Sequence, residues 1–189
     1  MSIQKQASSR VEVGEHTYGC AVNIRTWKGG DAPENSKLKI GKYCSLADNI
    51  NIFLGGNHRV DWISTYPFAT FGWPHTIPMR SQLPTTKGDI IIGNDVWIAS
   101  HATILSGVKI GHGAVIGTLA VVASDVEPYG IAVGNPARVV KKRFSDEDIK
   151  RLLEIAWWDW PLIYIQECAG VLSSGDLKTL FAYYNIKKK

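Results

Sequence analysis

The stretch from Ile92 to Glu127, IGNDVWIASHATILSGVKIGHGAVIGTLAVVASDVE, decides the fold. It divides into six consecutive hexapeptides whose first residue is always aliphatic and whose fifth is always valine or alanine. The second residue is glycine or alanine in five of the six, with Leu105 as the exception. The pattern also occurs in IGKYCS and LADNIN, which begin at Ile40 and Leu46, and as a shorter trace in VGEHTY.

A period of six fits neither the alternation of a half-buried strand nor the turn of an amphipathic helix. Hexapeptide repeats instead build a parallel β-helix, in which each hexapeptide forms one flat side and three sides make one coil. The aliphatic first residues and the small fifth residues face the interior. Because a single repeat cannot bury a core, the coils must stack. The sequence therefore predicts a mainly β, triangular prism.

This register assigns several residues that would otherwise attract chemical interpretations. Cys44 takes position five, which favours a packed thiol over a nucleophile. His16 and His101 take position four and His112 takes position three, so we expect them to be turn residues at the surface. His75 lies outside the repeat, and its role is not assigned by register.

The repeat is interrupted between Ile52 and Ile92. The separation between Ile40 and Ile92 is not a multiple of six, so an insertion of about residues 55–89 is predicted. It is rich in proline and aromatic residues, and a loop of this length in a compact domain usually has a function. His58 stands at its start, where a rigid coil gives way to the loop and can hold a reactive group.

After the repeat, Gly134, Asn135 and Pro136 predict a turn. Ser145 and Asp148 then form a capping box that begins an amphipathic helix. Its apolar face is expected to hold Ile149, Leu152, Leu153 and Ala156, and Pro161 is expected to end it. Two shorter helices are predicted around Ile163–Leu172 and Asp176–Tyr184, and the tryptophans at 157, 158 and 160 are expected to pack this part on the prism.

These elements predict a β-helix domain over residues 1–140 and a helical extension over residues 141–189. The composition, 45% hydrophobic and 20% charged, is that of a globular protein. With no long apolar run and only three widely spaced cysteines, we expect a cytoplasmic protein with reduced thiols. The ligand spacings indicate no metal site. The net charge of +4 is too mild to indicate nucleic acid, but local basic residues can bind a phosphorylated small molecule.

The chain resembles the hexapeptide-repeat acyltransferases, and within them the xenobiotic acetyltransferases related to type B chloramphenicol and streptogramin A acetyltransferases. The resemblance runs from about Ile40 to Pro161 and is carried by GNHRVDWISTYPF, KGDIIIGNDVWIAS, GHGAVIG, DVEPYGIAVGNPARVVKKRF and LLEIAWWDWP. It implies left-handed coils and a homotrimer with active sites between subunits. It also implies that acetyl-coenzyme A is the acyl donor.

The resemblance further implies that His58 is the general base for direct attack of an acceptor hydroxyl on the thioester, in a ternary complex. An imidazole that titrates near neutrality suits that role. Asp61 or a backbone carbonyl would orient the ring, and the sequence leaves this choice open. Trp97 is expected near the acceptor or packed on the insertion. Trp62 and Tyr66 are candidates for stacking on the acceptor, and Asp61 is a further candidate for contacting it.

The expected contacts of coenzyme A are spread over the later part of the repeat and the residues after it. They are Ala99, Gly117 and Thr118 for the pantetheine, Asn135, Pro136 and Ala137 near the adenine, and Lys141, Lys142 and Arg143 for phosphate.

The acceptor remains open, because RTWKGGDAPENSKL and GWPHTIPMRSQLPTT differ from the antibiotic-modifying enzymes. A carbohydrate or antibiotic-like alcohol is favoured. One alternative is an amino-sugar N-acetyltransferase of surface-glycan synthesis. The other is a β-helix scaffold without catalysis.

Overall fold

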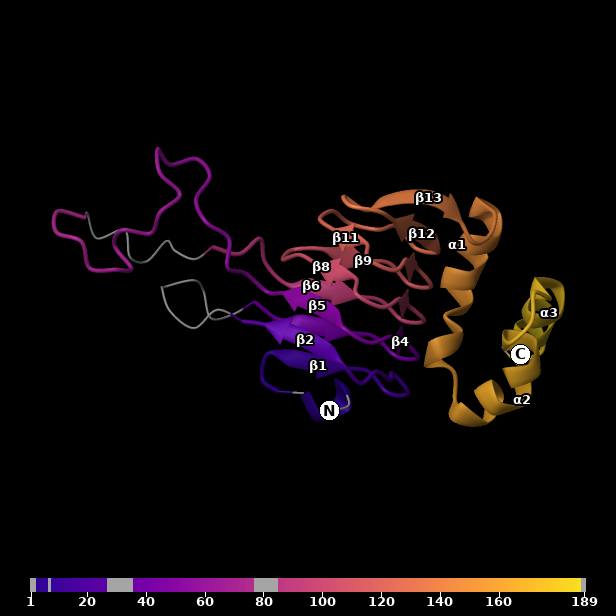
Figure 1. Ribbon diagram of the computed structural model, residues 1–189. Helices are drawn as coiled ribbons and strands as arrows, with labels where there is room; N and C mark the ends of the chain where they lie inside the picture. The colour runs from indigo at the N-terminus through magenta and orange to yellow at the C-terminus, as the bar shows by residue number, and fades with distance from the viewer. Residues whose placement is uncertain (1–2, 7, 27–35, 77–84, 188–189) are drawn as a thin grey trace. The chain divides into compact units, whose positions relative to one another are not determined.

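The computed structural model describes residues 3–6, 8–26, 36–76 and 85–187 (Figure 1). The chain divides into two compact units, Met1–Lys142 and Arg143–Lys189. Of the elements in the described residues, the first unit holds every β-strand, after a short 3-10 helix at Ile3–Gln6. The second unit holds the three α-helices.

The strands of the first unit form three sheets. The first sheet consists of β1 (Val11–Val13), β3 (Leu38–Ile40), β6 (Ile90–Ile92) and β9 (Lys109–Ile110). The second consists of β4 (Ser45–Leu46), β7 (Trp97–Ile98), β10 (Val115–Ile116), β12 (Gly130–Val133) and β13 (Arg138–Lys142). The third consists of β2 (Val22–Arg25), β5 (Ile50–Phe53), β8 (Thr103–Ile104) and β11 (Val121–Val122). All pairs are parallel except β12 with β13.

From β3 to β11 the chain visits the three sheets in turn, so each of these coils adds one strand to each sheet (Figure 1). Ile92 pairs with Ile110 and Ile98 pairs with Ile116, so each coil is three hexapeptides long. The aliphatic residues at position one from 92 to 122 are all at most 2% exposed. The predicted mainly β stack of hexapeptide coils is therefore confirmed, whereas the left-handed sense of the coils stays a prediction.

The small residues at position five complete one continuous core. All of those from Val96 to Val126 are buried, and so is Cys44, whose packed thiol was predicted. Cys44 Sγ donates a hydrogen bond to the carbonyl oxygen of Gly93 at 3.1 Å. Thr17 is a polar residue at this position, and its hydroxyl donates to Gly41 O and accepts from Cys44 N. Both of its polar functions are satisfied inside the prism.

In the assigned hexapeptides, the position-four residue at the corner adopts the left-handed region, except for Asp125. Eight position-four residues have φ between +56° and +81°: His16, Tyr43, Asn49, Asp95, His101, Gly107, Gly113 and Leu119. The predicted turn role of His16 and His101 is confirmed, and both are exposed. His112 differs from the expectation because it is half-buried, and its Nδ1 accepts the backbone N–H of Asn94 at 2.8 Å.

The insertion leaves the prism after β5 and returns at β6, where Figure 1 shows it extending beyond the strands. Leu38 of β3 pairs with Ile90 of β6, although the chain between them is far longer than the three hexapeptides of one coil. Its neck is closed by two backbone hydrogen bonds between Asn57 and Thr85. The Asn57 side chain also donates to Ser106 Oγ at 3.1 Å, which ties the neck to the next coil.

The helical unit begins with α1 (Asp146–Ile155), and the predicted capping box is present. Ser145 Oγ accepts the backbone N–H of Asp148 at 3.2 Å. The prediction that Pro161 ends this helix is wrong. Ala156 adopts a left-handed conformation with φ of 40°, and its N–H closes the helix on Leu152 O. Ile155 joins Ile149 and Leu152 on the buried face, while Leu153 and Ala156, which were expected there, are only half-buried.

Two further helices follow a 3-10 turn at Trp157–Asp159. They are α2 (Leu162–Leu172), for which Pro161 is the N-cap, and α3 (Leu177–Lys187). Trp160 stacks on Tyr184 of α3 with ring centroids 5.8 Å apart. Packing of the three tryptophans on the prism stays a prediction. Among the described residues, no helix is long and apolar enough to cross a membrane.

Candidate active site

His58 follows the glycine pair Gly55–Gly56 at the exit from β5, one residue beyond the anchored Asn57. Its side chain is exposed, and Nδ1 lies 2.7 Å from the carbonyl oxygen of Thr65. A carbonyl oxygen can only accept a hydrogen bond, so Nδ1 must carry the proton in the neutral ring. The Nε2 atom then holds the lone pair. This tautomer can accept a proton at Nε2, as a general base must.

Asp61 does not contact His58 through any described bond but forms a two-point ion pair with Arg59. Arg59 Nε donates to Asp61 Oδ1 at 2.7 Å, and Arg59 Nη2 donates to Asp61 Oδ2. This hydrogen bonding lowers the pKa of Asp61 to about 2. Of the two groups that the sequence left open, the structure thus places a backbone carbonyl, not Asp61, beside the imidazole.

Trp62 and Tyr66 lie on the same loop as His58 but in different surroundings. The Arg59 guanidinium lies 5.5 Å from the centre of the Trp62 ring, within cation–π range. Tyr66 belongs to a cluster of exposed rings that contact one another, namely Tyr66, Phe68, Phe71 and Trp73. An exposed cluster of this kind is typical of a surface that binds a ligand or a partner.

Trp97 projects outward from β7, as position six predicts, and is 53% exposed. It stands in a cross-strand row on the second sheet, between Ser45 of β4 and Val115 of β10. The row continues through Ile131 to Lys141 on β13. Trp97 is thus part of an outer sheet face, and the structure describes no hydrogen bond or ring contact between its side chain and the described part of the insertion.

Ala99 and Gly117 are stacked at one corner of the prism. They lie three hexapeptides apart, and backbone bonds join Ala99 N to Ile116 O and Gly117 N to Ala132 O. A Cβ on Gly117 would lie 2.8 Å from Val133 Cγ1, so a larger residue there would force the Val133 side chain to shift. Thr118 follows with an exposed side chain.

The turn between β12 and β13 holds the next three candidates. Asn135 and Pro136 are exposed, whereas Ala137 is buried in the core and its N–H donates to Val121 O at 2.8 Å. Asn135 and Pro136 can therefore offer side chains to a ligand. The carbonyl oxygen of Ala137 also has a partner, because it accepts a hydrogen bond from Arg138 Nη1 at 2.8 Å.

The three basic candidates differ in their surroundings. Lys142 Nζ lies 2.9 Å from Glu127 Oε2, and Arg143 lies over the ring of Phe144. Arg143 also belongs to the helical unit, whereas Lys141 and Lys142 end the prism unit. Lys141 is exposed at the end of the row that contains Trp97.

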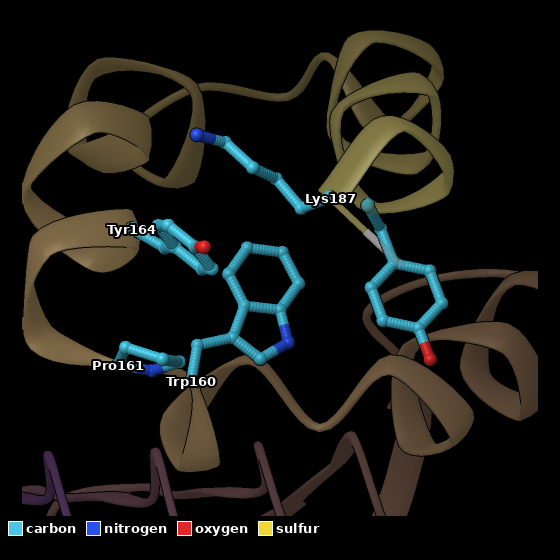
Figure 2. Close-up of a pocket in the computed structure, with 5 residues that line it drawn as sticks. Trp160, Pro161, Tyr164 and Lys187 are labelled. Carbon is cyan, nitrogen blue, oxygen red and sulfur yellow. The ribbon is translucent and has the colours of Figure 1, made fainter. Parts of the chain in front are cut away.

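A pocket of about 150 Å³ lies in the helical unit, away in sequence from all these candidates (Figure 2). Its walls are Trp160, Pro161, Tyr164, Tyr184 and Lys187. Lys187 Nζ lies 2.9 Å from Glu167 and 4.4 Å from the centre of the Tyr164 ring. The pocket contains no residue that the sequence predicted for acetyl transfer.

Sequence reasoning missed Thr65 and the pairing of Arg59 with Asp61. The identity of Thr65 gave no signal, because its main-chain oxygen makes the contact and any residue carries one. An arginine two positions before an aspartate is a detectable signal for a local ion pair, since the two side chains can meet across one intervening residue.

Comparison with known proteins gives a consistent result. A model of the bacterial transferase hexapeptide family, described as six repeats, matches residues 89–124. The chain is 45% identical to a chloramphenicol acetyltransferase of Escherichia coli over 80% of this chain and 73% of that protein. It is 52% identical to a probable macrolide acetyltransferase of Lysinibacillus sphaericus over 66% of this chain and 70% of that protein.

Solved structures agree at the level of the fold. A hexapeptide-repeat acetyltransferase of Vibrio cholerae, solved with acetyl-coenzyme A, superposes with a TM-score of 0.54 at 22% identity, over 72% of this chain and 62% of that one. A galactoside acetyltransferase in complex with coenzyme A gives a TM-score of 0.50 at 26% identity, over 73% and 62%. The matches therefore span about three fifths of each solved chain.

Proposed function

Because the chain belongs to the family of hexapeptide-repeat acetyltransferases, in the branch of the chloramphenicol acetyltransferases, we propose that it transfers acetyl from acetyl-coenzyme A to a hydroxyl of a small acceptor. The observation that carries the proposal is the hydrogen bond from His58 Nδ1 to Thr65 O, which leaves Nε2 as a base. In the proposed reaction, the second substrate is an alcohol of an antibiotic or a carbohydrate.

In the proposed mechanism, His58 Nε2 takes the proton of the acceptor hydroxyl as its oxygen attacks the acetyl carbonyl carbon. The tetrahedral intermediate collapses with loss of the carbon–sulfur bond, and His58 returns the proton to the departing thiolate. Direct transfer needs no acyl-enzyme. The one cysteine of the repeat, Cys44, is buried, and its pKa is raised to about 11. A buried thiol that stays protonated is a poor nucleophile.

For the acyl donor, we propose the corner of Ala99, Gly117 and Thr118 as the pantetheine site, with Asn135, Pro136 and Ala137 beyond it. Lys141 would contact a phosphate, with Lys142 and Arg143 as further candidates. The fit rests on the stacked small residues and on the exposed lysine at the end of the second sheet. Trp97, Trp62 and Tyr66 are proposed for the acceptor, whereas the pairing of Asp61 with Arg59 argues against direct contact.

The assembly is part of the same proposal. We infer left-handed coils, a homotrimer with a site between subunits, and a cytoplasmic location, with residues 1–140 as the β-helix domain and 141–189 as its extension. The resemblance supports the first two. The division of the chain at Lys142 supports the domain boundary.

The decisive experiment compares His58→Ala with a matched His75→Ala variant, because both residues are exposed histidines of the insertion. Release of coenzyme A is measured with chloramphenicol, a streptogramin A, a macrolide and a galactoside as acceptors. Loss of a general base should lower kcat by about 10²–10⁴-fold in His58→Ala only. Equal turnover of the two variants would refute the role of His58.

The same panel separates the alternative functions. The two relatives act, by name, on chloramphenicol and a macrolide, so an antibiotic alcohol is the first acceptor expected. The galactoside acetyltransferase makes a sugar hydroxyl the second. Mass spectrometry of the product separates an ester from an amide. Absence of both acetyl-coenzyme A binding and turnover would instead indicate a scaffold.

A further inference from the structure

The contact between His58 and Thr65 is made within a segment that has neither helix nor strand. The two partners are well separated along the loop, and the ladder hydrogen bonds of β5 end before them. A side chain on an exposed loop is held in one geometry only if other contacts fix the intervening backbone. The contacts that do so can be identified along the loop.

The first half of the segment is fixed by Arg59, Asp61 and Trp62, which we name the 59–62 clamp. The guanidinium makes two parallel contacts with the carboxylate, and its face lies over the indole. Two-point pairing of this type restricts both side chains more than a single contact does. Arg59 is only half-buried, so the clamp lies near the surface beside His58.

The second half is fixed by a turn that begins at Ser64. Its hydroxyl accepts the backbone N–H of Tyr66 at 3.1 Å, and Phe68 N donates to Tyr66 O at 3.0 Å. Thr65 lies within this turn, after the segment that the clamp spans. Its carbonyl is therefore restrained by the turn that contains it and by the clamp that precedes it.

We infer that the 59–62 clamp positions the Thr65 carbonyl against His58 Nδ1 and thereby selects the tautomer that leaves Nε2 unprotonated. The inference deepens the proposed function and rests on the proposed role of His58. Arg59 and Asp61 act through the loop backbone, so they are positioning residues. This assigns Asp61 a different role from the acceptor contact that the sequence suggested.

The test reads the tautomer directly, by ¹⁵N–¹H correlation spectra of the histidine rings at a pH where they are neutral. The full-length protein should show His58 as the Nδ1–H tautomer. Arg59→Ala and Asp61→Ala should each convert His58 largely to the Nε2–H form or to a mixture. Arg59→Lys keeps the positive charge but loses the two-point contact with Asp61, so it should convert the His58 tautomer only in part. Lys187→Ala breaks an ion pair of the helical unit and should leave His58 unchanged.

Kinetics add a second readout. If the clamp acts only through His58, Arg59→Ala should lower kcat at least about tenfold with the KM for acetyl-coenzyme A unchanged, and the double variant Arg59→Ala/Asp61→Ala should be no worse than either single one.

An unchanged His58 tautomer in Arg59→Ala and Asp61→Ala would overturn the inference. So would an equal change in Lys187→Ala, because the effect would then be general. The spectra do not depend on turnover. A clamp-dependent tautomer in a protein without acetyl transfer would support the clamp while refuting the proposed function.

Discussion

Cys44 lies in the narrow interior of the prism, where its thiol is fully buried. Burial is the main cause that raises its pKa from 9.0 to about 11. The neutral thiol is thus favoured in the folded protein. The contribution to stability is present below about pH 9 and is lost as the pH rises toward 11, because the unfolded chain then releases a proton that the folded chain retains.

We predict that alkylation at pH 8 modifies Cys20 rapidly and leaves Cys44 unmodified in the native protein. Cys20 is exposed, whereas Cys44 and Cys168 are buried and have raised thiol pKa values. Peptide mapping after timed treatment with iodoacetamide gives the rate at each site. Labelling of all three at equal rates in the folded state would contradict the packed-thiol assignment, and denatured protein is the control.

At the scale of the coil, separate steric effects restrict which residues fit at the second and fourth positions of the hexapeptide. Cβ atoms added to Gly41, Gly93 or Gly111 would lie 2.4–2.7 Å from atoms of the next coil, so coil spacing requires glycine. Position four instead needs a left-handed φ, which glycine adopts without strain and other residues adopt at a cost. Both effects act at Gly113, which has a left-handed φ and no space for a Cβ beside the Tyr129 ring.

We predict opposite effects of two substitutions at position four. Gly113→Ala places a Cβ 2.4 Å from the buried Tyr129 ring at a φ of 67°, and should cost on the order of 2 kcal/mol. Leu119→Gly relieves the backbone strain of a φ of 62° and removes only an exposed side chain. It should therefore be neutral or stabilise the protein by up to about 1 kcal/mol. Unfolding in denaturant measures both. An equal loss of stability in both variants would show that the backbone conformation at position four does not decide the effect of a substitution there.

The start of α1 depends on its cap. Ser145→Ala removes the acceptor of the Asp148 N–H, so we expect the free energy of unfolding of the helical unit to fall by about 1 kcal/mol. Ser173→Ala is the control, because Ser173 ends α2 and is exposed. Hydrogen exchange in the first turn of α1 should rise in the first variant alone. Unchanged exchange in Ser145→Ala would show that the cap contributes little.

At the scale of the whole molecule, the single chain leaves much apolar surface uncovered. Trp97 on the outer face of the second sheet, and Phe71 and Trp73 on the insertion, are all more than half exposed. Such exposure in a compact domain is typical of surfaces that another molecule covers. A closed assembly of identical chains would cover it in the simplest way.

We therefore expect a trimer in solution. Three chains of 20.8 kDa give a mass of about 62 kDa. Light scattering coupled to size exclusion measures the mass, and Trp97→Lys with Trp73→Lys as a second variant tests which surface is buried. A mass of one chain at micromolar concentration would contradict the expected assembly. In that case the exposed aromatic residues would need a ligand as their partner.

By itself, the sequence determined the prism, its register and the position of the insertion. The reason is that a hexapeptide period is local, and the same residue types recur in the same environment in every coil from Ile92 to Val126. The break in the period between Ile40 and Ile92 showed where a segment had to leave the core. Helix ends were harder to predict, because Ala156 closes α1 through a backbone conformation that no proline marks.

Only the tertiary structure decided what surrounds His58. A hydrogen bond to the backbone of Thr65 depends on the path of an irregular loop, and backbone atoms carry no sequence identity. The engagement of Lys142 by Glu127 likewise depends on how separate segments meet. Periodicity specifies which side chains face inward. It does not specify which outward side chains and main-chain oxygens face one another, and the proposed chemistry depends on those.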